Sequence, residues 1–231
     1  RIFRITSTRN PLVSPPNIAG ASIDSLLPCL TLPEQEARTR ARRELWSHPA
    51  TEVRAAVSAW VAETDGVDTV APEKLLEALW VTAGNGAPDN ALLERALTHA
   101  DPRVRSAAVR VLRHGRFELP YPRVVAATLR AAQDVHPRVR TEAIALATWL
   151  ADKTDGARIF LTALEEPVDA DMAQGVEAVF KMLGPEIAAL KPAPDSLAAQ
   201  FMAGAYRFAT PETAQEVPLL NLSAENMKLF E

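Results

Sequence analysis

Four arginines fall within six consecutive positions of this 231-residue sequence, at Arg38, Arg40, Arg42 and Arg43. Guanidinium groups at this density can bind phosphates or an acidic protein partner. On a helix, however, this spacing spreads the side chains around the axis, and nearby glutamates supply intramolecular partners. Two interpretations therefore stay open for this group: a partner-binding site, or side chains that are solvated or paired within the chain.

Other residues that could carry chemistry are sparse. The four histidines, His48, His99, His114 and His136, fall at predicted helix ends and show no HExxH or other short metal-ligand spacing. The single cysteine, Cys29, lies beside leucines, which predicts a small buried side chain and excludes a CxxC or CxxCH motif. The sequence thus predicts no catalytic residues, no metal site and no cofactor.

Two similar motifs that lie 35 residues apart indicate a repeat: Asp101-Pro102-Arg103-Val104-Arg105 and His136-Pro137-Arg138-Val139-Arg140. An aspartate can cap the free amides of a first helical turn, and proline is tolerated where no amide is needed. The histidine predicts a weaker cap. Apolar residues then recur at helical spacing, which predicts an amphipathic helix after each motif. A third copy, Glu52-Val53-Arg54, lies 51 residues before Arg105, so an additional helix is expected between them.

Apolar stripes and terminating residues predict a series of helices, over residues 34–47, 50–64, 72–82, 89–98, 102–114, 122–133, 137–151, 156–164 and 171–183, with weaker patterns from 195 onward. A repeat of roughly 20–50 residues with one helix pair per unit is typical of a solenoid, in which neighbouring pairs share one core. Residues 1–6 alternate polar and apolar side chains, which predicts one short strand. We therefore expect an all-α fold: an α-solenoid with a short N-terminal extended arm.

Composition supports a folded helical chain with uneven charge. Hydrophobic residues make up 48% and aromatic residues only 6% of the sequence, which suits closely packed helices. The net charge of −4 argues against nonspecific binding of nucleic acid. Residues 151–231 hold 6 basic and 13 acidic side chains, so the molecule should be electrically polar from end to end. No apolar run is long enough for a membrane span, and a start without Met suggests a processed chain or a fragment.

The Asp-Pro-x-Val-Arg helix starts resemble those of HEAT-type repeats, over about residues 34–185. This resemblance implies a hydrogen-bonded ladder between successive repeats. It gives structural roles to Asp101, Pro102, Arg105, Pro137, Arg140 and Arg54. The expected division is an extended arm and linker over 1–33, a HEAT-like repeat domain over 34–190 and a C-terminal helical extension over 191–231.

A narrower resemblance covers most of the chain. Five stretches resemble, in order, the middle of large bacterial proteins of the membrane-bound-dehydrogenase type: Arg1-Ile-Phe-Arg-Ile-Thr, Pro16-Asn17-Ile18-Ala19-Gly20-Ala21-Ser22-Ile23, Arg40-Ala41-Arg42-Arg43-Glu44-Leu45, Glu77-Ala78-Leu79-Trp80 and Val109-Arg110-Val111-Leu112-Arg113. Such proteins join a sugar-dehydrogenase-like β-propeller, a HEAT-type segment and a haem-binding CxxCH cytochrome c domain. The resemblance implies that residues 1–6 are the last propeller strand and that the chain is periplasmic or otherwise extracytoplasmic. This chain departs from the family in lacking CxxCH, so no haem is implied here.

The leading functional hypothesis is a noncatalytic scaffold that binds a protein partner or adjacent domains of a larger polypeptide, and links a dehydrogenase propeller to a c-type cytochrome. The alternative is a HEAT-like nucleic-acid-binding protein of the DNA glycosylase type, which needs a cationic concave groove and aromatic side chains. The possible basic residues are Arg103, Arg110, Arg113, Arg116 and Arg138, and the aromatic ones are Trp46, Trp60, Trp80 and Trp149. Trp60 and Trp149 lie on stripes that are expected in the core. An enzyme for a small molecule would instead show a deep pocket with convergent polar groups.

Overall fold

The computed structural model describes residues 14–63, 71–86, 88–114 and 119–203, and within these ranges the chain contains helices and no β-strand. The expected strand over residues 1–6 lies outside the described residues. The helices are α1 (Ile23–Leu26), the 3₁₀ helix η1 (Leu27–Thr31), α2 (Gln35–Leu45), α3 (Ala50–Ala62), α4 (Pro72–Gly84), α5 (Asn90–Leu97), α6 (Pro102–His114), α7 (Tyr121–Ala132), α8 (Pro137–Ala147), α9 (Lys153–Ala163), α10 (Ala170–Ala189) and α11 (Leu197–Met202).

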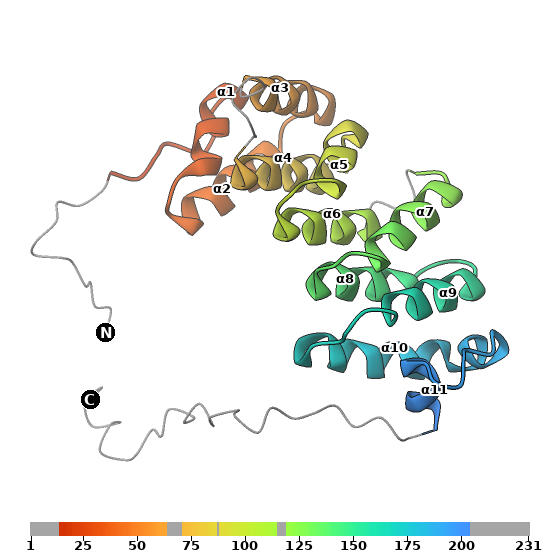
Figure 1. Cartoon of the computed structure of the whole chain (residues 1–231). Helices are drawn as coiled ribbons and strands as arrows, with labels where there is room; N and C mark the ends of the chain where they lie inside the picture. Colours follow the sequence, from red (N-terminus) through yellow and green to blue (C-terminus); the bar gives the residue numbers. More distant parts are fainter. Residues whose placement is uncertain (1–13, 64–70, 87, 115–118, 204–231) are drawn as a thin grey trace, which may run out of the picture.

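The helices stack in two layers that curve into an arc (Figure 1). Helices α2, α4, α6, α8 and α10 line the inside of the arc, and α3, α5, α7 and α9 lie on the outside. Helix α8 packs against its inner-layer neighbours α6 and α10 and against the outer helices α7 and α9. This open stack of helix pairs confirms the predicted all-α solenoid.

The buried stripes of α6 and α8 follow the apolar spacing that the sequence shows. In α6, Val104 and Ala108 are fully buried, one helical turn apart. In α8, Val139 and Ala143 repeat this pattern at the corresponding positions. Full burial of a valine side chain contributes about 1.5–3 kcal/mol, so the two stripes fix which face of each helix meets the core.

Residues 23–31, within the predicted arm and linker, form α1 and η1 and contribute to the helical core. Ile18 is 3% exposed, and Leu26 and Leu30 of α1 and η1 are fully buried. Both short helices pack against α2. Cys29 is a buried free thiol, which confirms the prediction of a packed side chain.

Helix α10 continues to Ala189, past the Gly184-Pro185 pair at which the sequence predicted its end. Pro185 removes the amide that would pair with the Lys181 carbonyl. Lys181 and Pro185 are both exposed, so a water molecule can donate a hydrogen bond to the Lys181 carbonyl. Ile187, which is fully buried, holds the last turn against the core.

Helix α9 begins at Lys153, before the predicted start at Gly156. The side chain of Asp152 explains the earlier start, because it accepts hydrogen bonds from the amides of Thr154 and Asp155. Gly156 then lies where α9 approaches α8 closely: a Cβ atom on this residue would sit 2.6 Å from the carbonyl oxygen of Ala147.

Candidate functional site

Three inner helices begin with the same arginine contact. Arg38, Arg105 and Arg140 are each the fourth residue of α2, α6 and α8. In each case Nη1 donates to the two carbonyls that lie six and five residues earlier in the chain, at 2.6 and 2.9 Å for Arg38, 2.8 and 2.7 Å for Arg105, and 2.8 and 3.2 Å for Arg140. The arginine therefore closes the loop that leads into its helix.

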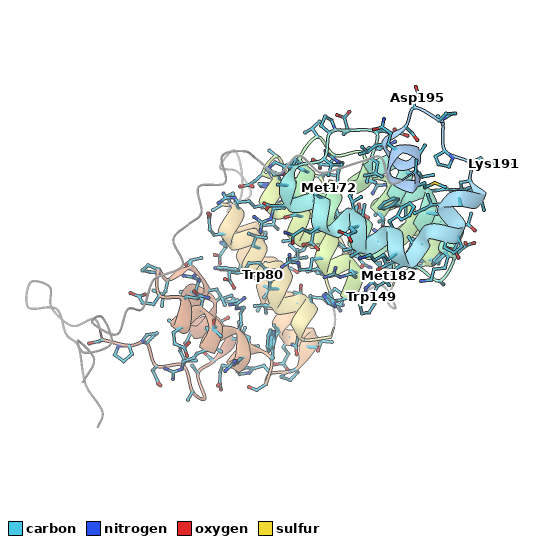
Figure 2. The ribbon with its side chains drawn as sticks, turned by 90° about the horizontal axis from the view of Figure 1, so that it is seen from below. Trp80, Trp149, Met172, Met182, Lys191 and Asp195 are labelled. Atoms are coloured by element: carbon cyan, nitrogen blue, oxygen red, sulfur yellow. The ribbon has the colours of Figure 1, made fainter. Side chains whose placement is uncertain are left out.

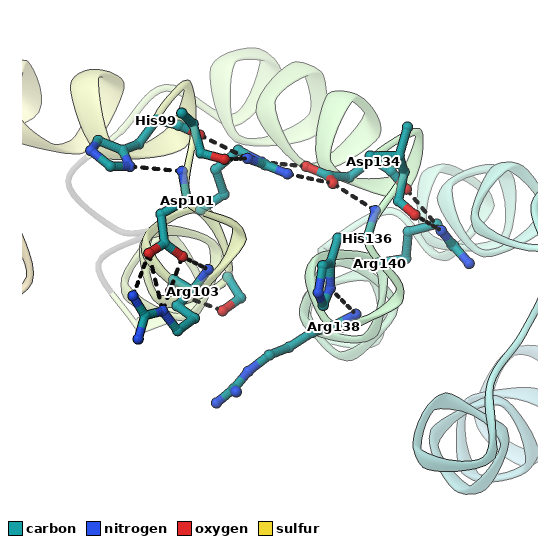
Figure 3. A network of polar contacts seen from close by, with 11 residues as sticks. His99, Asp101, Arg103, Asp134, His136, Arg138 and Arg140 are labelled. Carbon is teal, nitrogen blue, oxygen red and sulfur yellow. Dashed lines mark hydrogen bonds and ion pairs between the residues drawn. The ribbon is translucent and has the colours of Figure 1, made fainter. Parts of the chain in front are cut away.

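Two of these arginines also reach into the next repeat. Arg105 binds both carboxylate oxygens of Asp134 with one edge of its guanidinium, Nε to Oδ2 at 2.6 Å and Nη2 to Oδ1 at 2.8 Å. Arg140, which is 1% exposed, donates from Nη2 to the carbonyl of Pro167. The first contact ties α6 to the start of α8 (Figure 3), and the second ties α8 to the loop before α10.

The carboxylate of the ladder is Asp134, not the capping Asp101 that the resemblance suggested. Asp101 caps α6 by accepting from the Arg103 amide and also pairs with the Arg103 guanidinium. Hydrogen bonds from the Arg103 side chain lower the pKa of Asp101 to about 2. His136 takes the capping position in α8, where Nδ1 accepts from the Arg138 amide at 3.2 Å.

Histidine and aspartate exchange places between the two repeats. Before α6, His99 Nδ1 accepts from the Asp101 amide at 3.0 Å, and before α8, Asp134 Oδ1 accepts from the His136 amide at 2.9 Å. Each pair thus forms two successive turns that lead into its helix (Figure 3). Only the second pair places a carboxylate where the preceding repeat can reach it. An alignment of the two capping residues, Asp101 and His136, does not show that His99 and Asp134 differ two positions earlier.

Arg54, which the sequence aligned with Arg105 and Arg140, does not occupy their position. It lies exposed on the outer helix α3, and its side chain makes no hydrogen bond or ion pair with the residues that the structure describes. Arg38 on α2 makes the corresponding contacts instead. The Val-Arg similarity of Arg54 was misleading because the contact depends on being fourth in an inner helix, with free carbonyls just upstream.

The four clustered arginines divide into two pairs. Arg38 and Arg42 both approach Glu77 of α4, with Nε to carboxylate distances of 3.7 and 3.5 Å, and Arg42 also lies 5.4 Å from the centre of the Trp80 ring. Arg40 and Arg43 are exposed, and neither forms an ion pair within the described ranges.

A second arginine–carboxylate contact joins α6 to α8. Glu142 is 8% exposed and accepts from Arg110 Nε at 3.0 Å and from its Nη2, while Arg113 Nη1 lies 3.8 Å from the other carboxylate oxygen. Inner helices are therefore linked both at their first turns and along their length.

Three exposed side chains, Arg138, Trp149 and Met182, lie on or directly after the inner helices α8 and α10, at the inner face, meaning the surface of α4, α6, α8 and α10 that the outer helices do not cover. Arg138 is the second residue of α8, and Trp149 lies eleven residues later, just past the end of that helix at Ala147. Met182 is the counterpart of Trp149 on α10, twelve residues after the first residue of its helix. Trp149 is 52% and Met182 61% exposed (Figure 2).

The exposure of Trp149 corrects the expectation that it belongs to the core. Trp149 follows the end of α8, where the amide donates back to Leu146 in a tighter turn and carries the ring out of the buried stripe. Trp60, by contrast, is half-buried against the core and lies under the Lys74 ammonium, 4.5 Å from the ring centre.

The basic residues expected of a nucleic-acid groove are largely paired within the chain. Asp101 pairs with Arg103, and Glu142 pairs with Arg110 and Arg113. Arg138 is exposed and its side chain has no ion pair among the described residues; Figure 3 shows it extending away from the network of contacts. Arg116 lies outside the described ranges.

The described part of the chain offers no metal-binding cluster and no helix that could cross a membrane. Residues 14–63, 71–86, 88–114 and 119–203 hold no group of three or more His, Cys, Asp or Glu side chains arranged to bind a metal ion. None of the helices seen in these ranges has the length and apolarity to cross a membrane.

Comparison with known proteins supports the repeat assignment. The family model described as HEAT repeats matches residues 90–180, from the start of α5 into α10. No curated protein and no solved structure matches the chain. The matched region contains both arginine links described above, at Arg105 and Arg140. Residues 90–180 are therefore a HEAT-type helical repeat.

Proposed function

We propose that this chain is a noncatalytic scaffold that binds a protein partner on its inner face. Helical repeats of this type commonly use an extended face for protein–protein interaction. The observation that carries the proposal is the group formed by Arg138, Trp149 and Met182, which lie on or directly after the inner helices α8 and α10, because all three side chains are exposed.

The composition of this group fits a protein better than a nucleic acid. Tryptophan, methionine and arginine are enriched at protein interfaces, where tryptophan and arginine often supply most of the binding energy. A nucleic-acid groove would need several guanidinium groups that are available to phosphates. The α6 arginines Arg103 and Arg110 are already paired, with the carboxylates of Asp101 and Glu142.

The arginine links favour binding by holding the inner face in one arrangement. Arg105 fixes α6 against the start of α8, and Arg140 fixes α8 against the loop before α10. A partner that meets a preformed surface loses less binding energy to ordering of the surface. The same links that stabilise the stack thus prepare the surface.

Within a larger protein, the scaffold is proposed to space a dehydrogenase propeller from a c-type cytochrome in an extracytoplasmic electron-transfer system. This part of the proposal draws its support from the resemblance of the five sequence stretches alone. Its test is the reading frame on both sides of residues 1–231: a flanking propeller and a CxxCH motif are expected, and a different pair of neighbours would contradict it.

Photo-cross-linking with matched positions tests the inner face. A benzoylphenylalanine at Arg138 should capture one defined partner in cells of the source organism, whereas the same residue at Arg54 should not. Both arginines are exposed and without ion pairs in the described part of the chain, so the two variants differ mainly in the layer that carries the probe. Equal capture from Arg54, or salt-sensitive retention of the wild-type chain on DNA, would contradict the proposal.

A further inference from the structure

A pocket with a volume of about 380 Å³ opens between the η1–α2 segment and α4. Its walls are largely apolar and include Leu32, Leu76 and the Trp80 ring, and the Arg38 side chain also lines it. Glu73 and Glu77 supply carboxylates from one side of α4, since they lie one helical turn apart. The pocket thus combines an aliphatic and aromatic wall with acidic groups.

The carboxylate of Glu77 lacks the hydrogen bonds that a buried acid normally has. The residue is 4% exposed, yet Oε2 accepts no hydrogen bond from any described residue. Arg38 and Arg42 approach only to 3.7 and 3.5 Å. Arg38 directs its Nη1 to backbone carbonyls, and Arg42 lies over Trp80. Burial, opposed by these two arginines, raises the pKa of Glu77.

The chain itself shows which group completes such a carboxylate. Glu77 is the sixth residue of α4, and Glu142 is the sixth residue of α8. Glu142 receives two hydrogen bonds from Arg110 of the preceding inner helix. Helix α2 offers Glu77 no equivalent pair of hydrogen bonds, and an open pocket adjoins the carboxylate instead.

We infer that the pocket between η1–α2 and α4 binds an arginine side chain of a protein partner, whose guanidinium donates to the Glu77 carboxylate as Arg110 does to Glu142. This inference rests on the proposed function and assigns a chemistry to part of the partner. The aliphatic stem of the incoming arginine lies against Leu76 and Trp80, because long basic side chains bury their stems on apolar surfaces. Glu73, which is exposed at the pocket, complements the positive charge.

The experiment is an NMR titration of the purified chain with the peptide acetyl-Gly-Arg-Gly-amide. The Trp80 indole N–H and Leu76 methyl resonances should shift and saturate with a Kd of roughly 1–10 mM, as expected for one side chain with about seven heavy atoms. The matching citrulline peptide, which keeps the shape but not the charge, should bind at least tenfold more weakly. A lysine peptide should bind more weakly than arginine, because it cannot form two parallel hydrogen bonds with one carboxylate.

Variants locate the binding. Glu77→Gln should weaken binding of the arginine peptide at least fivefold, and Glu73→Gln about twofold; the exposed Glu73 can be changed without disturbing the fold. Glu177→Gln on α10, where Glu177 pairs with Lys181 at the surface, is the matched control and should leave the Kd unchanged. Equal binding of citrulline, tighter binding of lysine, or an unchanged Kd in Glu77→Gln would overturn the inference.

The two proposals can fail separately. If a benzoylphenylalanine at Arg138 captures a partner while the arginine peptide leaves the Trp80 resonance unchanged, the pocket assignment is wrong and the scaffold function stands. If the peptide binds at Glu77 but Arg138 captures nothing, the scaffold function is wrong as stated.

Discussion

The contact between Arg105 and Asp134 should stabilise the folded state by about 2 kcal/mol. Its two hydrogen bonds join opposite charges at 2.6 and 2.8 Å, and the side chains are only 17% and 11% exposed. Hydrogen bonds to charged groups contribute about 1.5–3 kcal/mol, and partial desolvation of both groups offsets some of the gain from a pair. The substitutions Arg105→Met and Asp134→Asn, alone and together, measure the coupling directly.

The single substitutions should differ in size. Arg105→Met should lower the free energy of unfolding by about 3 kcal/mol, because it also leaves the carbonyls of His99 and Ala100 without this donor. Asp134→Asn should cost about 2 kcal/mol, since the amide oxygen can still accept from the His136 backbone. Urea unfolding followed by circular dichroism at neutral pH supplies all four values of the cycle.

The coupling should disappear in acid. Burial acts to raise the pKa of Asp134, but hydrogen bonds from Arg105 and the His136 amide outweigh it, so the pKa lies below the ordinary value of 3.8. A carboxyl whose pKa is lowered by folding stabilises the protein above its unfolded pKa. That contribution is lost as the pH falls through the folded pKa. Repeating the cycle across this acid range should show the coupling declining towards zero.

Arg54→Met is the matched control, because it makes the same substitution at an exposed arginine of the outer layer. It should change the free energy of unfolding by less than about 0.5 kcal/mol. The reasoning would be refuted by a coupling below about 0.5 kcal/mol at neutral pH, or by an Arg54→Met cost that equals the cost of Arg105→Met.

Three further outcomes follow from the structure. Glu142→Gln should lower the free energy of unfolding by about 1 kcal/mol, because it weakens the contact with Arg110. Glu77→Gln should keep or raise the urea midpoint at neutral pH. Folding raises the pKa of Glu77 above 4.5, so the stability that this group contributes is present below pH 4.5 and is lost as the pH rises through the folded pKa. Gly156→Ala should lower the free energy of unfolding by about 1–3 kcal/mol, because its Cβ would lie 2.6 Å from a backbone oxygen. Gly175→Ala is the control and should not lower it, because the nearest atom to its Cβ is a methyl carbon at 3.6 Å. Thermal melts of the two variants measure the difference. NMR titration of the Asp101 carboxyl should give a pKa near 2, so its contribution is present above 3.8 and lost as the pH falls towards 2; a value near 3.8 would contradict the pairing.

The sequence predicted those elements whose signals are local. Asp101 and Pro102 fix the start of α6, and the apolar spacing after Arg105 gives its buried face. The same signals after Pro137 predict α8. Capping chemistry and helical periodicity act within one or two turns, so a single repeat carries enough information to place a helix.

Contacts between repeats were harder to predict, because they depend on packing rather than on neighbours in sequence. The partner of Arg105 is Asp134, 29 residues later, and the partner of Arg140 is a backbone carbonyl, which has no sequence signature. One signal was available: the His–Asp order before α6 is reversed before α8. Arg38, treated as a possible partner-binding residue, proved to repeat the contacts of Arg105 at the start of α2.

The surface residues of the candidate site could be recognised only in the structure. Met182 lies within a helix that the sequence predicted, but nothing in the sequence distinguishes it from a buried methionine such as Met172, which is fully buried (Figure 2). Trp149 was expected in the core because helical spacing was extended past Ala147, where α8 ends.

Oxidative footprinting tests the central claim most directly, because tryptophan and methionine are readily oxidised when exposed. Hydroxyl radicals are applied to the chain alone and to its complex with the partner captured at Arg138, and oxidation is read by mass spectrometry. Trp149 and Met182 should be strongly protected from oxidation in the complex. Met202 on α11, which is 42% exposed, should be oxidised equally in both samples. Unchanged oxidation of Trp149 and Met182 in the complex would show that the partner binds elsewhere.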